Sequence, residues 1–217
     1  MPLPKTFSVP ASQEQQGDQL PIFLTPLVPT DAQAVHAIIS TDKHLADMTV
    51  VIPWPYTLSD AQGFIEFATG AAAAAEDVDH PETSSTIYAI RLGDPESALV
   101  GCIEVEVRPI LQGACSLATN PYPGRTWTEW LPGYWLDRQV RGQGIMTRVI
   151  GRIKELAADD ACVARVRIDC FAENPASRKV AERAGFQLEG LIRNSAARGG
   201  VIKDTYQLSW IPPSRHE

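Results

Sequence analysis

The chain has 217 residues and a formal net charge of −7, with 44% hydrophobic and 21% charged residues. This composition is typical of a globular protein, and the length suits one large domain or two small ones. The acidic balance argues against a nucleic-acid partner, because such proteins usually carry a basic face. It does not exclude a small cationic or amine substrate.

The cysteines and histidines form neither a disulfide framework nor a metal-ligand pattern. The four cysteines include no Cys-x-x-Cys pair, and the four histidines are isolated. The sequence also lacks a basic and apolar leader and an apolar run of roughly 18 residues. We therefore expect no metal, no membrane partner and a cytoplasmic location. The cysteines are Cys102, Cys115, Cys162 and Cys170.

The first part of the chain predicts an arm, a strand and two helices. Residues 1–19 are polar and broken by prolines, which is typical of a loosely ordered arm before a domain over residues 20–212. Residues 20–24 predict a first strand. Capping boxes at residues 30–33 and 59–62 predict the starts of two helices.

A predicted β-hairpin and a long insert follow these helices. Residues 86–92 and 98–107 have the composition of paired strands. In the second strand, Glu104 and Glu106 alternate with apolar residues, so both acids should lie on one face. Residues 108–131 predict a long loop rich in proline and glycine. Loops of this length are usually functional or disordered, and the tryptophans in this one favour a packed flap.

A glycine-rich turn lies between the strand-like residues 134–136 and a strongly periodic helix. Gly142 and Gly144 allow a ligand to approach the backbone closely and permit positive φ values. The helix start offers unpaired N–H groups and the positive end of its dipole, and Arg141 adds a cationic side chain. The turn therefore predicts a phosphate site. It lacks the Gly-Lys-Ser/Thr of a Walker A loop, and Thr147 replaces the third glycine of the dinucleotide fingerprint.

The second half of the chain alternates between helices and strands. An apolar stripe from Ile145 to Ala157 predicts a helix, and residues 163–170 alternate as a strand does. Residues 134–171 therefore predict a βαβ crossover. Asn174 followed by proline predicts the start of another helix. The last two strands are predicted at residues 186–190 and 203–210, with a polar turn at residues 193–200. The fold class is α/β with mixed topology.

The spacing Gln139-x-x-Gly142-x-Gly144 resembles the (Gln/Arg)-x-x-Gly-x-(Gly/Ala) loop of the acetyl-CoA-dependent N-acetyltransferases, the GNAT superfamily. Further segments match this family in order and spacing over about half of the chain. The branch most similar to this sequence contains the ribosomal-protein N-terminal acetyltransferases of the RimJ/RimL type. The matching segments are residues 134–136, Asn174-x-x-Ser177, Ala184-Gly185-Phe186, Leu188-Glu189-Gly190 and Asp204-x-Tyr206-x-Leu208.

The resemblance implies a GNAT fold, which is a mixed, mostly antiparallel central sheet flanked by helices. It implies acetyl-CoA as the cofactor and direct transfer of the acetyl group to a primary amine, with no covalent acyl-enzyme. In this family the central strand separates from its neighbour, so backbone groups around Leu136 would bind the pantetheine arm and the loop would bind the pyrophosphate. The expected cofactor-binding residues are Leu136, Arg141, Gly142, Gln143, Gly144, Ile145, Met146, Thr147, Asn174 and Ser177.

Direct transfer requires one group that protonates the departing thiolate. Many relatives use a tyrosine seven residues after the asparagine that corresponds to Asn174, but this chain has Ala181 there. RimL-like relatives resemble this chain in having a serine three residues after that asparagine. The resemblance therefore implies Ser177 as the acid, whereas an ordinary serine on a helix surface is the competing interpretation.

A second group must take a proton from the attacking ammonium. RimL-like relatives place a glutamate soon after the Glu-Gly pair, but residues 193–196 contain no acid here. Glu104 and Glu106 are substitutes by position, on a strand where they share a face. Asp137, at the end of the central strand, and a chain of waters remain alternatives for the base.

The acceptor is expected to be an amine-bearing small molecule or a peptide N-terminus. The candidates for the wall of its cleft are Trp54, Tyr56, Trp127 and Trp130. For each of them, ordinary packing in the protein interior is an equally good interpretation. The insert at residues 108–131 favours a small-molecule acceptor. Since the usual tyrosine and glutamate are missing, a non-catalytic acyl-CoA-binding module remains an alternative. A nucleotide-binding protein is disfavoured by the missing loop lysine, and a homodimer is a further possibility.

Overall fold

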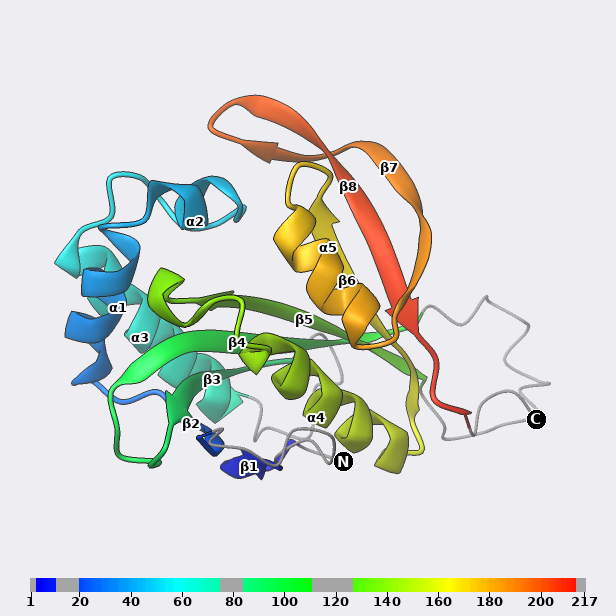
Figure 1. Ribbon diagram of the computed structural model, residues 1–217, viewed down its shortest axis with the longest axis horizontal. Helices are drawn as coiled ribbons and strands as arrows, with labels where there is room; N and C mark the ends of the chain where they lie inside the picture. Colours follow the sequence, from blue (N-terminus) through cyan, green and yellow to red (C-terminus); the bar gives the residue numbers. More distant parts are fainter. Residues whose placement is uncertain (1–2, 11–19, 75–83, 111–126, 214–217) are drawn as a thin grey trace.

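The computed structural model of the protein describes residues 3–10, 20–74, 84–110 and 127–213. The described strands form one eight-stranded sheet in the order β1-β2-β3-β4-β5-β6-β8-β7 (Figure 1). The strands are β1 (Phe7–Val9), β2 (Ile22–Pro26), β3 (Ser84–Leu92), β4 (Leu99–Pro109), β5 (Thr128–Leu136), β6 (Val163–Phe171), β7 (Gln187–Arg198) and β8 (Val201–Trp210). The helices are α1 (Asp31–Ile39), α2 (Lys43–Asp47), α3 (Leu58–Ala74), the 3-10 turn η1 (Arg138–Val140), α4 (Ile145–Asp159) and α5 (Pro175–Arg183).

Neighbouring strands run antiparallel except β5 and β6, which are parallel. The chain connects these two strands through α4, so the predicted βαβ crossover is confirmed. Parallel neighbours need such a crossover because a tight hairpin can join only antiparallel strands. The mixed, mostly antiparallel sheet predicted from the family resemblance is likewise confirmed.

The sheet has an apolar layer on each face. On β4, Ile103 and Val105 pack in the cluster that includes α4 and α5, whereas Cys102 packs in the cluster of α1 and α3. Successive residues of a strand point to opposite faces, so one strand supplies both layers. The stripe of α4 is buried as predicted, including Val149, Ile150 and Ile153. No described helix combines the length and apolar character that crossing a bilayer requires.

The amino-terminal segment is more ordered than the sequence suggests. Phe7 and Val9 are buried, and β1 pairs with β2 along the edge of the sheet. Phe7 contacts Tyr88 edge-to-face with 5.2 Å between ring centroids, and the Tyr88 hydroxyl donates to the carbonyl of Pro4 at 2.8 Å. The prediction of a loosely ordered arm is therefore wrong for residues 3–10, because two apolar side chains cover the edge. Residues 11–19 lie outside the described part of the chain.

Both predicted early helices form, but other residues cap them. Thr30 has helical dihedrals and makes no side-chain cap bond, while the Asp31 Oδ2 accepts from the Val28 N–H at 2.9 Å. At α3, the Thr57 N–H donates to Asp60 Oδ2 at 2.7 Å and the Asp60 N–H donates to Thr57 Oγ1 at 3.2 Å. This reciprocal capping box lies two residues before the predicted one.

Two predicted loops are shorter than the sequence indicates. The predicted loop at residues 108–131 overlaps the end of β4 and the start of β5, although residues 111–126 lie outside the described part. The predicted turn at residues 193–200 is wrong, because β7 continues to Arg198 and β8 begins at Val201. Gly199 and Gly200 have φ values of +55° and +78°. A two-residue hairpin turn of type I′ requires positive φ at both positions, and glycine adopts positive φ without strain.

The parallel strands β5 and β6 pair only near their beginnings. Their last paired residues are Trp130 and Val166, although β5 continues to Leu136 and β6 to Phe171. Pro132 follows two residues after Trp130 and has no N–H to donate to a neighbouring strand. The sheet therefore opens between the carboxyl ends of β5 and β6, which is where ligands bind in many α/β proteins.

Candidate active site

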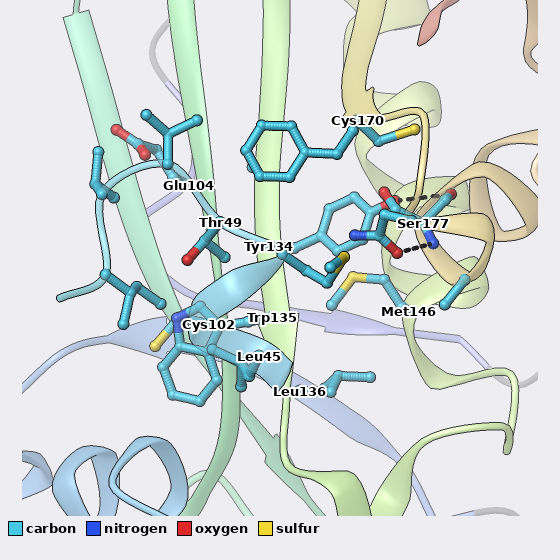
Figure 2. Close-up of a pocket in the computed structure, with 18 of the residues that line it drawn as sticks. Leu45, Thr49, Cys102, Glu104, Tyr134, Trp135, Leu136, Met146, Cys170 and Ser177 are labelled. Atoms are coloured by element: carbon cyan, nitrogen blue, oxygen red, sulfur yellow. Dashed lines mark hydrogen bonds between the residues drawn. The ribbon is translucent and has the colours of Figure 1, made fainter. Parts of the chain in front are cut away.

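A cavity of about 1330 Å³ occupies the region where β5 and β6 separate (Figure 2). The starts of α4 and α5 line one part of it. Residues 48–53, α3 and the outer face of β4 line another part. Of the ten residues predicted to bind the cofactor, nine line this cavity. The exception is Gln143, whose Nε2 donates to the carbonyl of Gln139 at 3.3 Å.

The glycine loop forms one end of the cavity. Gly142 and Gly144 have φ values of +78° and +76°, as the sequence predicts for a turn that needs glycine. Gly144 is the N-cap of α4 and makes no side-chain cap bond, and no atom lies within 4 Å of the position a Cβ would take at either glycine. The first turn of α4 thus lines the cavity without a side-chain cap, and its N–H groups lie at the positive end of the helix dipole. This geometry suits a phosphate group.

The side chain of Arg141 turns away from that open space. Its Nη2 lies 2.6 Å from Asp42 Oδ2, and its Nε donates to the carbonyl of Leu136 at 2.9 Å. The guanidinium thus holds the loop against α2 and the central strand. It also occupies the carbonyl of Leu136, one of the backbone groups predicted to bind the pantetheine arm. A direct contact between Arg141 and phosphate stays a prediction.

A hydrogen-bonded group forms at the start of α5. Asn174 is the N-cap, as predicted, and its Oδ1 accepts from the Ser177 N–H at 3.1 Å. The Ser177 Oγ lies 3.0 Å from the hydroxyl of Tyr134 on β5. Burial raises the pKa of the Tyr134 phenol well above its usual value and also raises the pKa of the Cys170 thiol beside it. Both groups are therefore protonated at neutral pH.

Glu104 faces the cavity from the other side of the sheet. Ile103 pairs with Tyr134 and packs towards α4, so the next residue of β4 points to the opposite face. Glu104 pairs with Gly133, whose lack of a side chain leaves space beside the carboxylate, and its Oε1 accepts from Ser85 Oγ. Figure 2 shows Tyr134 between Glu104 on one side and Ser177 with Cys170 on the other.

The other two acids considered as bases lie outside the lining of this cavity. Glu106 is two residues along β4 and forms an ion pair with Arg108, with 2.7 Å between Oε1 and Nε. The Asp137 Oδ1 accepts from the Gln139 N–H at 3.0 Å and so caps η1. Each carboxylate thus has a local structural role that does not require a substrate.

The four predicted aromatic residues of the acceptor wall are not together. Only Tyr56 lines the main cavity; burial, reinforced by Asp60, raises the pKa of its phenol to about 12. Trp54 lines a second hollow between α2 and the β7–β8 hairpin. Trp130 is 3% exposed and packs in the main core, because its position on β5 points it towards α4. Trp127 precedes β5, and its carbonyl accepts from the Ile110 N–H at 2.8 Å.

Local patterns did not indicate several residues that line the cavity. Tyr134 is half-buried on β5, and its hydrogen-bond partner follows 43 residues later, so only the folded chain joins them. Asp169 lines the cavity from β6, where burial raises the pKa of its carboxyl against the opposing effect of Arg167. The alternation along β6 gave no sign of this position, because Asp169 reaches the cavity only where β6 has separated from β5.

A cavity at the separating strands, an open helix start and a glycine loop are the features that the family resemblance predicted. The sequence-family model described as "Acetyltransferase (GNAT) domain" matches residues 22–187 of this chain. The chain belongs to the GNAT family. This match runs along the chain from β2 to the start of β7, and so includes the loop, α4, α5 and most of the residues that line the cavity.

Two bacterial relatives match parts of this GNAT chain. The "Probable N-acetyltransferase YjcK" of Bacillus subtilis (strain 168) is 32% identical over 81 residues, which is 37% of this chain and 45% of YjcK. The ribosomal-protein-serine acetyltransferase of Escherichia coli (strain K12) is 38% identical over 63 residues, which is 29% of this chain and 35% of that protein. The chain thus matches less than half the length of either relative.

Solved GNAT structures share the fold over nearly the whole chain. The microcin C7 self-immunity acetyltransferase MccE, in complex with acetyl-CoA and AMP, has a TM-score of 0.67 and 21% identity, covering 90% of this chain and 93% of that one. RimL, a ribosomal L7/L12 α-N-protein acetyltransferase in complex with coenzyme A, also has a TM-score of 0.67. It is 20% identical and covers 94% of this chain and 98% of its own.

Proposed function

We propose that this GNAT protein is an acetyl-CoA-dependent N-acetyltransferase that transfers the acetyl group directly to a primary amine. One relationship carries the proposal. Ser177 and Glu104 reach one cavity from opposite faces of the sheet, at the place where β5 and β6 separate. A proton donor and a proton acceptor on either side of an opening are what direct transfer between two bound molecules requires.

The cofactor half of the cavity fits coenzyme A. The open N-terminus of α4 offers N–H donors for the diphosphate, and the positive φ values at Gly142 and Gly144 bring the backbone close to it. The divergence of β5 and β6 leaves an extended opening suited to the pantetheine arm. When bound, acetyl-CoA supplies an activated acetyl thioester and a thiolate leaving group.

The two side chains divide the proton transfers between them. Glu104 Oε2 accepts a proton from the acceptor ammonium, while its Oε1 remains held by Ser85. The neutral amine nitrogen then attacks the acetyl carbonyl carbon, and it loses its second proton to solvent as the amide bond forms and the carbon–sulfur bond breaks. Ser177 Oγ donates its proton to the departing sulfur and is reprotonated from solvent. General acid–base assistance of this kind contributes roughly 100-fold or more to rate.

The acceptor side of the cavity suits an amine with an apolar neighbouring group. The carboxylate of Glu104 attracts the ammonium, and Met48, Ile52, Phe64 and Ile87 provide apolar walls. Named relatives act on amines of this general kind: one is a ribosomal-protein-serine acetyltransferase and another is an L-amino acid N-acetyltransferase, AaaT. We propose an α-amino group, free or at a peptide N-terminus, as the acceptor class.

Thiol release from acetyl-CoA tests this function with a panel of free amino acids, short peptides and polyamines. We expect Ser177→Ala and Glu104→Gln to lower kcat by at least about tenfold. Glu106→Gln is the matched control, because it changes an acid on the same strand outside the cavity and should retain activity. Calorimetric binding of coenzyme A without thiol release for any amine would instead identify a non-catalytic binding module.

A further inference from the structure

A tyrosine on the central strand contacts the serine assigned as proton donor. Tyr134 places its hydroxyl 3.0 Å from Ser177 Oγ and 3.4 Å from the carbonyl of the same residue (Figure 2). We propose that Tyr134 is a positioning residue that holds the hydroxyl hydrogen of Ser177 towards the cavity. This inference rests on the proposed function, since it concerns the orientation of the acid in that reaction.

The backbone on both sides of this contact is fixed. Tyr134 belongs to β5, where it pairs with Ile103 of β4. Ser177 lies in the first turn of α5, and its N–H donates to the Asn174 cap. What remains adjustable at Ser177 is the rotation of its hydroxyl, which has both the Tyr134 hydroxyl and the Cys170 thiol as neighbouring partners. A serine hydroxyl carries one hydrogen, so the direction of that hydrogen decides whether it can serve as a donor to a ligand.

Two arrangements of the hydrogens satisfy the 3.0 Å contact. If Ser177 donates to Tyr134, the tyrosine donates to the Ser177 carbonyl and the only hydroxyl hydrogen of the serine points away from the ligand. If Tyr134 donates to Ser177 Oγ, the serine hydrogen is free to point into the cavity. Burial raises the pKa of the Tyr134 phenol, so this group keeps its hydrogen throughout the neutral range. Negative charge developing on a nearby sulfur favours the second arrangement, because both O–H dipoles then point towards it.

The second arrangement also strengthens Ser177 as a donor. A hydroxyl that accepts a hydrogen bond becomes more polarised and donates better to the next acceptor. Tyr134 therefore acts through Ser177 and does not have to contact the substrate. Phenylalanine would fill the same space between β5 and α5 but would leave the rotation of the serine hydroxyl unrestrained.

The experiment compares Tyr134→Phe with Tyr88→Phe. Tyr88 is a matched control because its buried hydroxyl donates to the carbonyl of Pro4 and does not line the cavity. We expect Tyr134→Phe to lower kcat by about tenfold, with the KM for acetyl-CoA unchanged. Tyr88→Phe should retain wild-type kcat. Replacement of Tyr134 by 4-aminophenylalanine, which restores a neutral donor at the same place, should recover most of the activity.

A binding measurement provides a readout that does not depend on turnover. Calorimetry compares coenzyme A with its desulfo analogue, in which hydrogen replaces the thiol, between about pH 6 and pH 9.5, so that the fraction of thiolate increases across the range. A donor aimed at sulfur favours the thiolate, so wild-type affinity for coenzyme A relative to the analogue should rise with pH. We expect this rise to be smaller in Tyr134→Phe and in Ser177→Ala.

The outcomes distinguish a failure of the role proposed for Tyr134 from a failure of the proposed acetyltransferase function. If Ser177→Ala leaves both kcat and the pH dependence unchanged, the proposed acid is wrong. If Ser177→Ala is impaired but Tyr134→Phe matches the wild type in both measurements, the role of Tyr134 is overturned and the function stands. Should the phenylalanine variant fail to fold, a folded 4-aminophenylalanine variant that has lost activity would equally overturn the role of Tyr134.

Discussion

Arg141 donates from Nη2 to Asp42 Oδ2 at 2.6 Å, and so joins two segments that lie 99 residues apart in the sequence. Asp42 is buried, and its other oxygen accepts from the Leu45 N–H at 3.0 Å as the N-cap of α2. Leu45 and Arg141 both line the cavity. The ion pair therefore connects the loop proposed to bind diphosphate with the start of α2, another part of the cavity lining.

We predict that Asp42→Asn and Asp42→Ala separate the two roles of this carboxylate. Asparagine retains a good N-cap but loses the charge, whereas alanine loses both. Asp42→Asn should lower the free energy of unfolding by roughly 1 kcal/mol, and Asp42→Ala by roughly 1 kcal/mol more. Urea denaturation measures both values. Equal stability of the two variants would show that the cap contributes nothing and would contradict the assignment.

A second prediction concerns the glycine at the start of α4. Gly144 has a φ of +76°, and alanine there should cost roughly 1–2 kcal/mol of stability and weaken coenzyme A binding by about tenfold or more. Gly151 lies within α4 with open space around it, so Gly151→Ala should leave binding unchanged and add up to about 1 kcal/mol of stability. Calorimetry measures coenzyme A binding by the two variants, and denaturation measures their free energies of unfolding. Similar behaviour of the two variants would argue against a special role for the loop.

The third prediction concerns a buried ion pair between α1 and β3. Arg91 and Asp31 side chains are each 6% exposed, with 2.8 Å between Nη2 and Oδ2, and Arg91 Nε also donates to Thr25 Oγ1. Arg91→Met leaves the aspartate charge buried without its partner and should cost about 3–5 kcal/mol. The exposed pair partner Lys43 is a control, because Lys43→Met should change thermal unfolding little. A loss below about 1 kcal/mol for Arg91→Met would contradict the prediction.

The fourth prediction follows from the pKa of Tyr56, which burial raises to about 12. The unfolded chain ionises a tyrosine near its ordinary pKa of about 10, whereas the folded protein keeps this phenol neutral. The stabilising contribution is therefore fully present below about pH 10 and is lost as the pH rises towards 12. Denaturation at alkaline pH should show a shallower loss for Tyr56→Phe than for the wild type. Identical pH profiles would show that Tyr56 ionises normally.

Repeating patterns within the sequence predicted the elements that position the site. The apolar stripe from Ile145 identified α4, the Asn174 cap identified α5, and the glycine spacing placed the loop between strand and helix. Each signal is local, since it depends on residues within one or two turns. The family resemblance supplied the mixed, mostly antiparallel sheet and the separation of its central strand, which no local pattern contains.

Features that depend on contacts between distant segments were not predicted. The Tyr134 hydroxyl meets Ser177 only because β5 and α5 pack together, and Arg141 turns to Asp42 only because α2 lies beside the loop. Trp130 was expected at the acceptor wall because the extent of β5 was underestimated. Once β5 is known to begin at Thr128, alternation along the strand places Trp130 towards α4.

The divergence of β5 from β6 leaves two strand edges facing each other inside the protein. Edges exposed at the rim of a sheet can recruit other polypeptides and lead to aggregation. Here the starts of α4 and α5 line the cavity at this opening, so the space between the strands suits a slender, flexible chain better than a protein strand with side chains on both faces. The fold thus leaves unpaired backbone hydrogen-bonding groups accessible to a narrow ligand and less accessible to strands of neighbouring proteins.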